Sequence, residues 1–600
     1  MTKIPFVGLH AHSGLSLNDG LGYPQDHMDF AYENGSDALA LTDHGHMNGL
    51  PYQVLHARKM KAEGKNFKPI FGVEAYFNPS LEQWREEYEK AKQEKKKGIK
   101  KDIELSIEDE RASKQKVVDI LKKRNHLILI AQNQTGLNNI FKLVSESYKD
   151  ENFYRYPRID YKLLDLYSDG VIASSACLGG VYAGDYWDYR DVGSDAILDA
   201  MRQTTKRMKD IFGERWFGEI QWNNIPEQHE LNQYIIQVCK EYDVELISTA
   251  DSHYPTPDAW KDRELYKRIG WLGKGGLPEY MSSELPSGVE EIGYELYPKN
   301  GEQMWESYHK YSKLVGFDYD DELVMDSIKR TDYIAHDLIE DFMPDNEVRL
   351  PSFVVPAGKT DIQALTEDCL TGLKEKGLGD KEGYIDRLKE ELFVIRDRGF
   401  AKYFLTMKAI ADKAASVQLT GPGRGSAAGS LVAYVLDITQ VDPIKHGLLF
   451  SRFLRKDATD YPDIDYDVSD PMEVKEMLIE EWGDDTVAPI SNYNTLQLRS
   501  LIKDVSKFYD VPFTEVNTVT GKMIFEATPI AKKVHGIKSG VYTPTFEEVM
   551  EYSETLKKFL NKYPHVKTHI EALLGQVRSV SRHAGGVVVG ENLDKWMPLV

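Results

Sequence analysis

The sequence lacks the features that mark secreted, membrane-spanning or disulfide-stapled proteins. It has only three cysteines in 600 residues, Cys177, Cys239 and Cys369. Their odd number and wide spacing fit a reducing compartment best. The N-terminal segment has no long apolar run, which argues against a secretory signal, and no stretch approaches the roughly 18 apolar residues that span a bilayer. We therefore expect a cytoplasmic protein with no membrane partner.

Basic residues are scarce relative to acidic ones. The 74 lysines and arginines stand against 96 aspartates and glutamates, a net charge of −22 at pH 7. This balance argues against a surface coated in nucleic acid, although an enzyme can confine its positive charge to one groove. The composition, 41% hydrophobic and 28% charged, excludes a disordered or fibrous chain. The length suggests about three to five domains.

Short apolar runs alternate with helical patterns over residues 1–265. The alternation predicts parallel strands joined by crossover helices. Seven strand-like units favour a barrel, although an open sheet also fits the pattern. The strand-like runs are residues 6–10, 37–42, 69–76, 126–131, 170–174, 216–222 and 244–249, and the main helical segments are 24–35, 50–63, 137–148 and 227–242.

A highly charged stretch interrupts this rhythm at residues 79–124. Its lack of apolar periodicity favours a solvated helical insertion. The alternative is a DNA-contacting finger through Lys95, Lys96 and Lys97. Further along, residues 258–410 have a mainly helical pattern, followed by a glycine-rich turn and an apolar helix at 431–438.

Histidines, carboxylates and one thiol gather at the ends of the predicted strands. In a barrel these ends converge on one mouth. Crowded carboxylates repel, and burying unpaired charge costs several kcal/mol, so divalent cations are implied. Imidazole, carboxylate and thiolate together suit zinc, manganese or iron, and the set is too large for one ion. The residues are His10, His12, Asp19, Asp43, His44, Glu74, His126, Cys177, Asp251 and His253, of which His126 opens its strand instead of ending it.

Four segments in this region resemble a known domain. FVGLHAHSGLSLNDG, LALTDHGHMNG, PIFGVEAYF and STADSHY are similar to the PHP (polymerase and histidinol phosphatase) domain that opens C-family replicative DNA polymerases. The resemblance implies a metal-dependent 3′→5′ exonuclease with two or three Zn²⁺ or Mn²⁺ ions. It also implies nine metal ligands: His10, His12, Asp19, His44, Glu74, His126, Cys177, Asp251 and His253. We expect His27, His46, His56 and His229 to be ordinary core or surface residues.

The glycine-rich turn GPGRGSAAGS at residues 421–430 leads into the apolar helix. It lacks the Gly-Lys-Ser/Thr of a Walker A loop. Exposed backbone N–H groups and the N-terminus of the following helix predict an anion site. Arg424 adds a cation with bidentate phosphate geometry, Gly425 permits close approach, and Ser426 can donate a hydrogen bond. A structural glycine turn is the alternative.

Carboxylates alternate with apolar residues in the segment YPDIDYDV at residues 461–468. A strand would place Asp463, Asp465 and Asp467 on one face. Carboxylates on one face repel unless they share cations, so a pair of Mg²⁺ ions is implied. Two such metals suit attack by a 3′-hydroxyl with loss of pyrophosphate. A solvated acidic edge strand is the alternative.

The segments YFLTMKAIADKA, LTGPGRGSAAGSLVAYVLDITQVDP, GLLFSRFL and YPDIDYDVSD resemble the palm of the same polymerases, the bacterial and phage DNA polymerase III alpha subunits. The resemblance implies a polymerase β-like nucleotidyltransferase fold. It implies that Asp463 and Asp465 are two of three catalytic carboxylates and that Arg424, Gly425 and Ser426 contact a dNTP. In the family the third carboxylate comes after the segment that matches residues 583–600. We therefore expect the 600-residue chain not to extend a primer by itself.

These patterns predict an α/β multidomain protein. A PHP-type distorted (β/α) barrel would occupy residues 1–265 and an α+β palm residues 266–493, followed by a helical thumb at 494–570 and a second, incomplete palm segment at 571–600. In the thumb, Arg499, Lys503 and Lys507 recur every four residues beside an apolar stripe. This spacing predicts a helix with one buried and one basic face. The basic face would either follow DNA phosphates or stay solvated.

The resemblance to these polymerases implies templated DNA synthesis from dNTPs on primer–template DNA, with a 3′→5′ exonuclease. A sliding clamp and other replisome subunits are expected partners through regions beyond these residues. One alternative is a metal-dependent nuclease with a scaffold palm, and another is one half of a split polymerase. Repair polymerases of the X family combine similar domains in the opposite order, which disfavours them.

Overall fold

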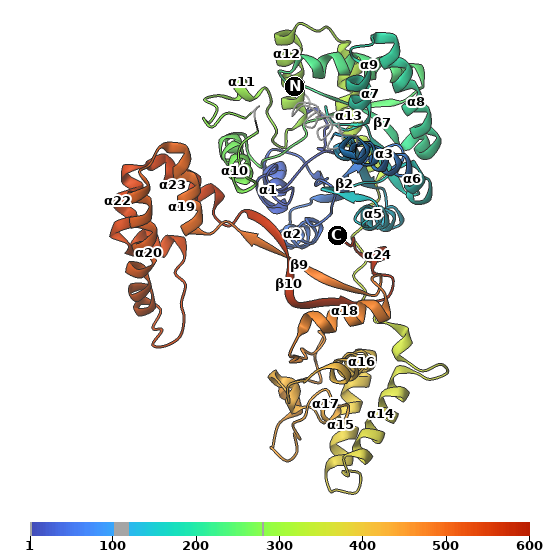
Figure 1. Cartoon of the computed structure of the whole chain (residues 1–600), viewed down its shortest axis with the longest axis vertical. Coiled ribbons are helices and arrows are strands. Elements are labelled where there is room, and N and C mark those ends of the chain that lie inside the picture. The colour runs from blue at the N-terminus through green and yellow to red at the C-terminus, as the bar shows by residue number, and fades with distance from the viewer. Residues whose placement is uncertain (1–2, 101–118, 279–280) are drawn as a thin grey trace. The chain divides into compact units, whose positions relative to one another are not determined.

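The computed structural model describes residues 3–100, 119–278 and 281–600 (Figure 1). The chain divides into two compact units. The first comprises Met1–Asp345, Tyr493–Val580 and Met597–Val600, and the second comprises Asn346–Asn492 and Ser581–Trp596. Residues 266–345, grouped with the palm from the sequence, therefore cluster with the N-terminal segment. None of the described helices is both long and apolar enough to cross a membrane.

Six strands form the sheet of the first unit, in the order β1-β2-β3-β6-β7-β8. They correspond to six of the seven strands predicted from the sequence. β3 runs antiparallel to both of its neighbours, whereas the other pairs are parallel, so the expectation of an all-parallel arrangement is wrong at β3. The strands are β1 (Ala38–Leu41), β2 (Lys68–Phe77), β3 (Asn125–Ala131), β6 (Val171–Ser174), β7 (Trp216–Gln221) and β8 (Glu245–Thr249).

The seventh predicted strand closes this sheet without being a regular strand. Residues 6–10 lie in the described part of the chain and form only isolated bridges there. Gly8 pairs with Leu39 of β1, and Ala11 pairs with Ser252 beyond the end of β8. Because this segment joins the two edge strands, the sheet curls round into the distorted barrel that the sequence predicts.

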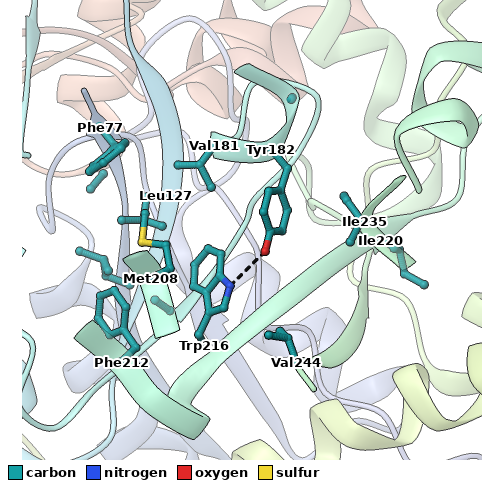
Figure 2. Packing of buried hydrophobic residues seen from close by; sticks show 14 of the residues in the cluster. Phe77, Leu127, Val181, Tyr182, Met208, Phe212, Trp216, Ile220, Ile235 and Val244 are labelled. Carbon is teal, nitrogen blue, oxygen red and sulfur yellow. Dashed lines mark hydrogen bonds between the residues drawn. The ribbon is translucent and has the colours of Figure 1, made fainter. Parts of the chain in front are cut away.

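Alternate residues of each strand face the inside and the outside of the barrel, as the two-residue period requires. On β3, Leu127 and Leu129 belong to the large outer core, whereas Ile128 and Ile130 belong to the small inner one. Figure 2 shows part of the outer core around Trp216 of β7, whose indole N–H donates to the Tyr182 hydroxyl at 3.1 Å. Only the inward positions can therefore carry a site inside the barrel.

The four main helices predicted between the strands are confirmed as α1, α2, α5 and α9. β4 (Phe153–Tyr154) and β5 (Tyr156–Pro157) form a small separate hairpin. The first unit up to residue 345 contains α1 (Pro24–Glu33), α2 (Leu50–Ala62), α3 (Leu81–Lys100), α5 (Gln134–Ser147), α6 (Tyr161–Tyr167), α7 (Val181–Tyr189), α8 (Ser194–Phe212), α9 (Pro226–Glu241), α10 (Trp260–Gly273), α11 (Val289–Ile292), α12 (Gly301–Val315) and α13 (Asp321–Tyr333).

The charged insertion begins as the predicted helix, α3. Its first turns are anchored by Trp84, which packs with Leu81 and Leu121. Residues 101–118 lie outside the described residues, and so do the side chains of Lys95, Lys96 and Lys97, on which the alternative of a DNA-contacting finger depends.

The predicted thumb segment is helical and packs within the first unit. Leu501, Ile502 and Val505 of α19 share a core with Leu265 of α10. His569 of α23 also contacts Asp262 of α10, with Nδ1 2.6 Å from Oδ1. The helices of this segment are α19 (Leu498–Ser506), α20 (Phe513–Val534), α21 (Phe546–Tyr552), α22 (Glu554–Lys562) and α23 (Pro564–Leu573).

The second unit is mainly helical. Helices α14 to α17 surround an apolar core of their own. β9 (Val487–Thr495) and β10 (Val577–Val589) pair as a two-stranded ribbon, and each strand passes from one unit into the other. The helices are α14 (Asp361–Glu375), α15 (Tyr384–Arg398), α16 (Ala401–Val417), α17 (Leu431–Val435), α18 (Pro471–Trp482) and α24 (Leu593–Trp596).

One buried lysine gives the first unit a pH-dependent stability. Burial lowers the pKa of Lys299 from 10.5 to about 8, and its ammonium donates to the Glu295 carbonyl at 3.0 Å. Between these two pH values the unfolded chain binds a proton that the folded chain has lost. Lys299 therefore makes the free energy of unfolding rise with pH across this window.

We expect Lys299→Met to flatten this rise relative to the unchanged chain. The measurement is urea unfolding at several pH values below, within and above the window. Lys313→Met, at an exposed position of α12, is the matched control and should keep the full slope. Parallel profiles for Lys299→Met and the unchanged chain would contradict the assignment.

Candidate functional site

The carboxylate of Glu74 lies at the centre of a buried cluster at one end of the barrel. Glu74 occupies an inward position of β2, and its side chain is fully buried. One oxygen is 2.7 Å from Nδ1 of His126, and the other is 2.7 Å from Nδ1 of His44. Nε2 of His12 is 3.2 Å from the second oxygen. A single carboxylate thus contacts three imidazoles from three different segments.

A second carboxylate, Asp251, completes the inner part of the cluster. Its Oδ1 is 3.0 Å from Nε2 of His10 and 3.2 Å from Nε2 of His12, and these two ring nitrogens are themselves 3.0 Å apart. Asp251 has a backbone φ of 49°, a left-handed conformation that costs energy for a residue other than glycine. The strained residue is thus the one whose carboxylate contacts His10 and His12.

Asp19 occupies the open side of the cluster. Its Oδ2 is 3.1 Å from Nε2 of His44 and 3.5 Å from Nε2 of His253, while Arg263 holds its other oxygen at 2.5 Å. The thiol of Cys177 is 3.6 Å from Nδ1 of His126. The structure therefore brings together all nine side chains that the resemblance to the PHP domain singles out.

The direction of β3 explains why His126 joins the cluster from the start of its strand. β3 is antiparallel to β2, and the register pairs His126 with Tyr76, two residues beyond Glu74. Because β2 and β6 run in the direction opposite to β3, the beginning of β3 lies at the same edge of the sheet as the ends of β2 and β6. His126 and Glu74 thus reach the same end of the barrel.

Four buried atoms of the cluster lack a hydrogen bond of good geometry within the described part of the chain: Nδ1 of His12, Nδ1 of His44, Oε2 of Glu74 and Oδ1 of Asp251. The last three nevertheless lie 2.7 to 3.2 Å from an oppositely charged partner. A buried polar atom without a good hydrogen bond costs about 1–3 kcal/mol. Cations held by these atoms would remove that cost, so the residues present fit a metal centre. Within this cluster, three groups each have ligand atoms within 4.8 Å of one another: His12, His44 and His253; His10, His12 and Asp251; and His44, Glu74 and His126.

Burial and neighbouring charges set the protonation of this cluster. Burial opposes the charged form of His44, but Glu74 and Asp19 outweigh it and raise its pKa to about 10. At His253 burial dominates and lowers the pKa to about 4. Burial would raise the pKa of Asp19, but His253 and Arg263 hold it well below its usual value. Asp19 therefore stays ionised at neutral pH.

Glu219 supports the cluster and was not found from the sequence. It occupies an inward position of β7, and its carboxylate is 2.7 Å from Nδ1 of His10. Ser174 and Thr249 donate to the same carboxylate at 2.7 and 2.5 Å. The contact of Glu219 with Nδ1 fixes the ring of His10 so that Nε2 faces Asp251. The signal was a lone glutamate within the apolar run at 216–222.

Asp43, which the sequence predicts at a strand end, stabilises the loop that carries Asp19. Its carboxylate accepts from the N–H of Ser13 and the hydroxyl of Ser16, each at 2.7 Å. Four other histidines, which we expect to be ordinary core or surface residues, contact groups outside the cluster. His27 contacts the Leu21 carbonyl, His46 the Leu15 carbonyl, His56 the Asp29 carboxylate and His229 the Tyr319 hydroxyl.

The glycine-rich turn and the acidic segment of the second unit lie side by side. Thr420 pairs with Val468 as an isolated antiparallel bridge, and Nη1 of Arg424 is 3.1 Å from Oδ1 of Asp467. Gly425 has a φ of 65°, and a Cβ on it would lie 2.7 Å from Oδ2 of Asp465. The positive φ favours glycine at this position, and a larger residue would also displace the Asp465 carboxylate.

The acidic segment keeps the predicted alternation but not the predicted strand. Residues 461–468 are all described, and only Val468 makes a β-bridge there. Asp463, Asp465 and Asp467 are exposed, while the apolar residues between them are partly buried. Extended backbone alone preserves the two faces, because alternation needs no neighbouring strand.

The predicted anion site at the helix after the turn is wrong. The helix, α17, begins at Leu431 and ends at Val435. The buried carboxylate of Glu391 accepts from the N–H groups of Leu431 and Val432 at 2.9 and 3.0 Å, and Arg387 pairs with it at 2.6 Å. An internal carboxylate thus fills the N-terminus of this helix.

The basic helix predicted in the thumb is confirmed as an amphipathic helix. Arg499, Lys503 and Lys507 are exposed, while Leu501, Ile502 and Val505 are buried. Lys507 pairs with Asp504 of the same segment at 3.0 Å. The exposed cations form one face, the arrangement that either of the predicted roles requires.

Two family models match this chain. Residues 363–600 match the bacterial DNA polymerase III alpha NTPase domain, and residues 8–223 match the PHP domain. Among curated proteins, the DNA polymerase III subunit alpha of Aquifex aeolicus is 34% identical over 99% of this chain and 48% of its own length. Those of Campylobacter jejuni and Borreliella burgdorferi are each 30% identical over 99% of this chain and 46% of their own length. The chain spans about half the length of these relatives.

We expect Glu74→Gln to reduce the metal content of the chain loaded with Zn²⁺ or Mn²⁺, because one neutral amide replaces the carboxylate shared by three imidazoles. We expect about two or three ions in the unchanged chain and at least one fewer in the variant. Metal analysis after dialysis measures this, and the unchanged chain should also gain thermal stability when metal is added. Glu82→Gln, at an exposed position of α3, is the control. Equal metal content in both variants would rule out the proposed role of Glu74.

Proposed function

Because this chain belongs to the bacterial DNA polymerase III alpha subunit family, we propose that it acts in DNA replication as a DNA-directed DNA polymerase. In this proposal the second unit contributes Asp463 and Asp465 to the site that transfers a nucleotide from a dNTP to the 3′-hydroxyl of a primer paired with a template. The barrel removes nucleotides from the 3′ end of a strand. A sliding clamp and other replisome subunits would be partners of the whole protein.

The observation that carries the nuclease proposal is the convergence of nine ligand-type side chains on Glu74 and its neighbours. When bound, two or three Zn²⁺ or Mn²⁺ ions would supply the Lewis acidity that activates water for attack at phosphorus. Glu74 and Asp251 are the inner anchors of that site. Asp19 is the most open of its carboxylates, with 37% of its side chain exposed against 13% for Asp251, so the substrate phosphate would approach past Asp19.

The nucleotidyl-transfer proposal is supported by the contact between the glycine-rich turn and the acidic segment. Asp463 and Asp465 would hold Mg²⁺, which neutralises phosphate charge and orients the reacting groups. Arg424 would contact the triphosphate of the incoming dNTP, with Gly425 and Ser426 beside it. Arg424 is 66% exposed, so its guanidinium is open to a ligand in solution.

We propose the same domain limits as the sequence predicts: a barrel at residues 1–265, a palm at 266–493 and 571–600, and a thumb at 494–570. Residues 266–345, the first part of this palm segment, cluster with the first unit. Arg499, Lys503 and Lys507 would contact the phosphates of the DNA duplex without reading its sequence.

Removing Asp19 or His253 tests the nuclease. We expect Asp19→Ala and His253→Ala each to lower 3′ trimming of a labelled single strand at least about 100-fold, because each removes a ligand on the open side. Gel analysis of the trimmed products measures the rate. Asp199→Ala, with 69% of its side chain exposed, should trim at the unchanged rate. Trimming that survives both substitutions would overturn this assignment.

Removing Arg424 tests the nucleotide site. We expect Arg424→Ala to weaken binding of a dNTP in Mg²⁺ by roughly 10- to 100-fold, the value of one or two charge-assisted hydrogen bonds. Equilibrium dialysis with a labelled dNTP measures it. Arg455→Ala removes an equally exposed guanidinium of the same unit and should bind normally. Equal affinity in the two variants would exclude Arg424 from the site.

A further inference from the structure

A cleft of 510 Å³ opens beside the metal-ligand cluster. Three segments of the first unit supply most of its walls: α7, the turn at residues 178–179 that follows Cys177, and residues 119–125 that lead into β3. None of these lining residues belongs to the nine ligand-type side chains. The cleft therefore adds a surface that the proposed chemistry does not explain.

A single glycine separates this cleft from the cluster. The Gly179 carbonyl accepts from the N–H of His126 at 2.7 Å, and its own N–H points to the thiol of Cys177 at 3.5 Å. A Cβ at Gly179 would lie 3.1 Å from the His126 ring. A ligand group in the cleft is thus one residue away from two members of the cluster.

Trp187 of α7 is the dominant side chain of the cleft. Its indole N–H donates to the Leu178 carbonyl at 3.1 Å, and the ring of Tyr186 packs against it edge-on at 4.9 Å. Arg190 lies 5.5 Å from its ring centroid. These contacts fix the ring, yet 47% of the residue stays exposed. A rigid, half-exposed aromatic side chain is typical of a binding hot spot.

The charges of the cleft are balanced. Lys122, Lys123 and Arg124 stand against Glu87, Asp119 and Asp188, and Lys123 pairs with Asp188 at 3.0 Å. A groove that tracks a phosphate backbone carries an excess of positive charge. The cleft therefore suits a planar, uncharged group.

Arg124 lies between the cleft and the cluster. Its guanidinium is 3.7 Å from the centroid of the Tyr156 ring and 5.2 Å from that of Tyr76. The Tyr76 ring in turn packs edge-on against His126 at 5.4 Å. The cation is thus fixed at the boundary where a phosphate attached to a group in the cleft would reach the cluster.

We propose that this cleft binds the nucleobase of the 3′-terminal nucleotide, stacked on Trp187, while the phosphate of that nucleotide lies at the cluster. The inference rests on the proposed nuclease function. Stacking accepts every base, because each has an aromatic face. The site therefore recognises the presence of a base at the end of a strand and not its identity.

A binding measurement tests the base site without turnover. The probe is a short single strand with 2-aminopurine as its 3′-terminal base and a phosphorothioate at the last linkage. We expect its fluorescence to be quenched on binding to the metal-loaded chain. Trp187→Ala should weaken binding about 5- to 100-fold, the range for one base–aromatic stack, and Trp187→Phe should restore most of it. Tyr189→Ala, at an exposed position of the same helix, is the control.

A kinetic measurement separates this inference from the function on which it rests. Trimming of a strand whose terminal nucleotide lacks its base should show a raised KM in the unchanged chain, and Trp187→Ala should abolish the difference between the two strands. Trp187-dependent binding by a chain that trims nothing would support the base site and refute the nuclease. Normal trimming, with Trp187→Ala equal to Tyr189→Ala in affinity and KM, would overturn the base site and leave the nuclease standing.

Discussion

The burial of one carboxylate, that of Glu74, is the constraint on which this end of the barrel depends. A lone ionised carboxylate in a protein interior costs several kcal/mol or more. The surrounding segments meet this cost by aiming His12, His44 and His126 at its two oxygens. Those imidazoles in turn need Asp251 and Asp19 as partners, so one buried charge determines the chemistry of the strand ends around it. The atoms left without hydrogen bonds are those that a cation would satisfy.

The barrel provides this arrangement because each strand changes character along its inward face. On β7 the inward positions change from Phe217, in the inner apolar core, to Glu219, in the polar layer. On β8 they run from Ile247 to Thr249, which donates to Glu219. The apolar half excludes water and holds the strands in register. The polar half can therefore be positioned by the backbone and not by long, flexible side chains.

Periodicity was enough to predict six strands and the four main helices between them, because this signal is local. Strand ends suggested ten candidate ligands, and the resemblance to the PHP domain selected nine of them. Features set by distant partners were not predictable. The antiparallel direction of β3 depends on which neighbours it meets, and that direction alone explains His126. Glu219 is one glutamate in an apolar run, and only its inward parity on β7 gives it a role. Likewise, the sequence predicts an anion site at α17 because nothing in it shows that Glu391, some forty residues earlier, fills the helix N-terminus.

The two candidate sites differ in how firmly the fold holds them. In the barrel, the core fixes buried ligands before any cation arrives. In the second unit, Asp463, Asp465 and Asp467 are exposed, and the contact between Arg424 and Asp467 is an open ion pair. Such an exposed pair contributes little to stability, so a phosphate could recruit the guanidinium at little cost. Glu391 keeps the neighbouring helix N-terminus occupied, so in the proposed nucleotide site Arg424 and the glycine turn would be the part free to respond to a ligand.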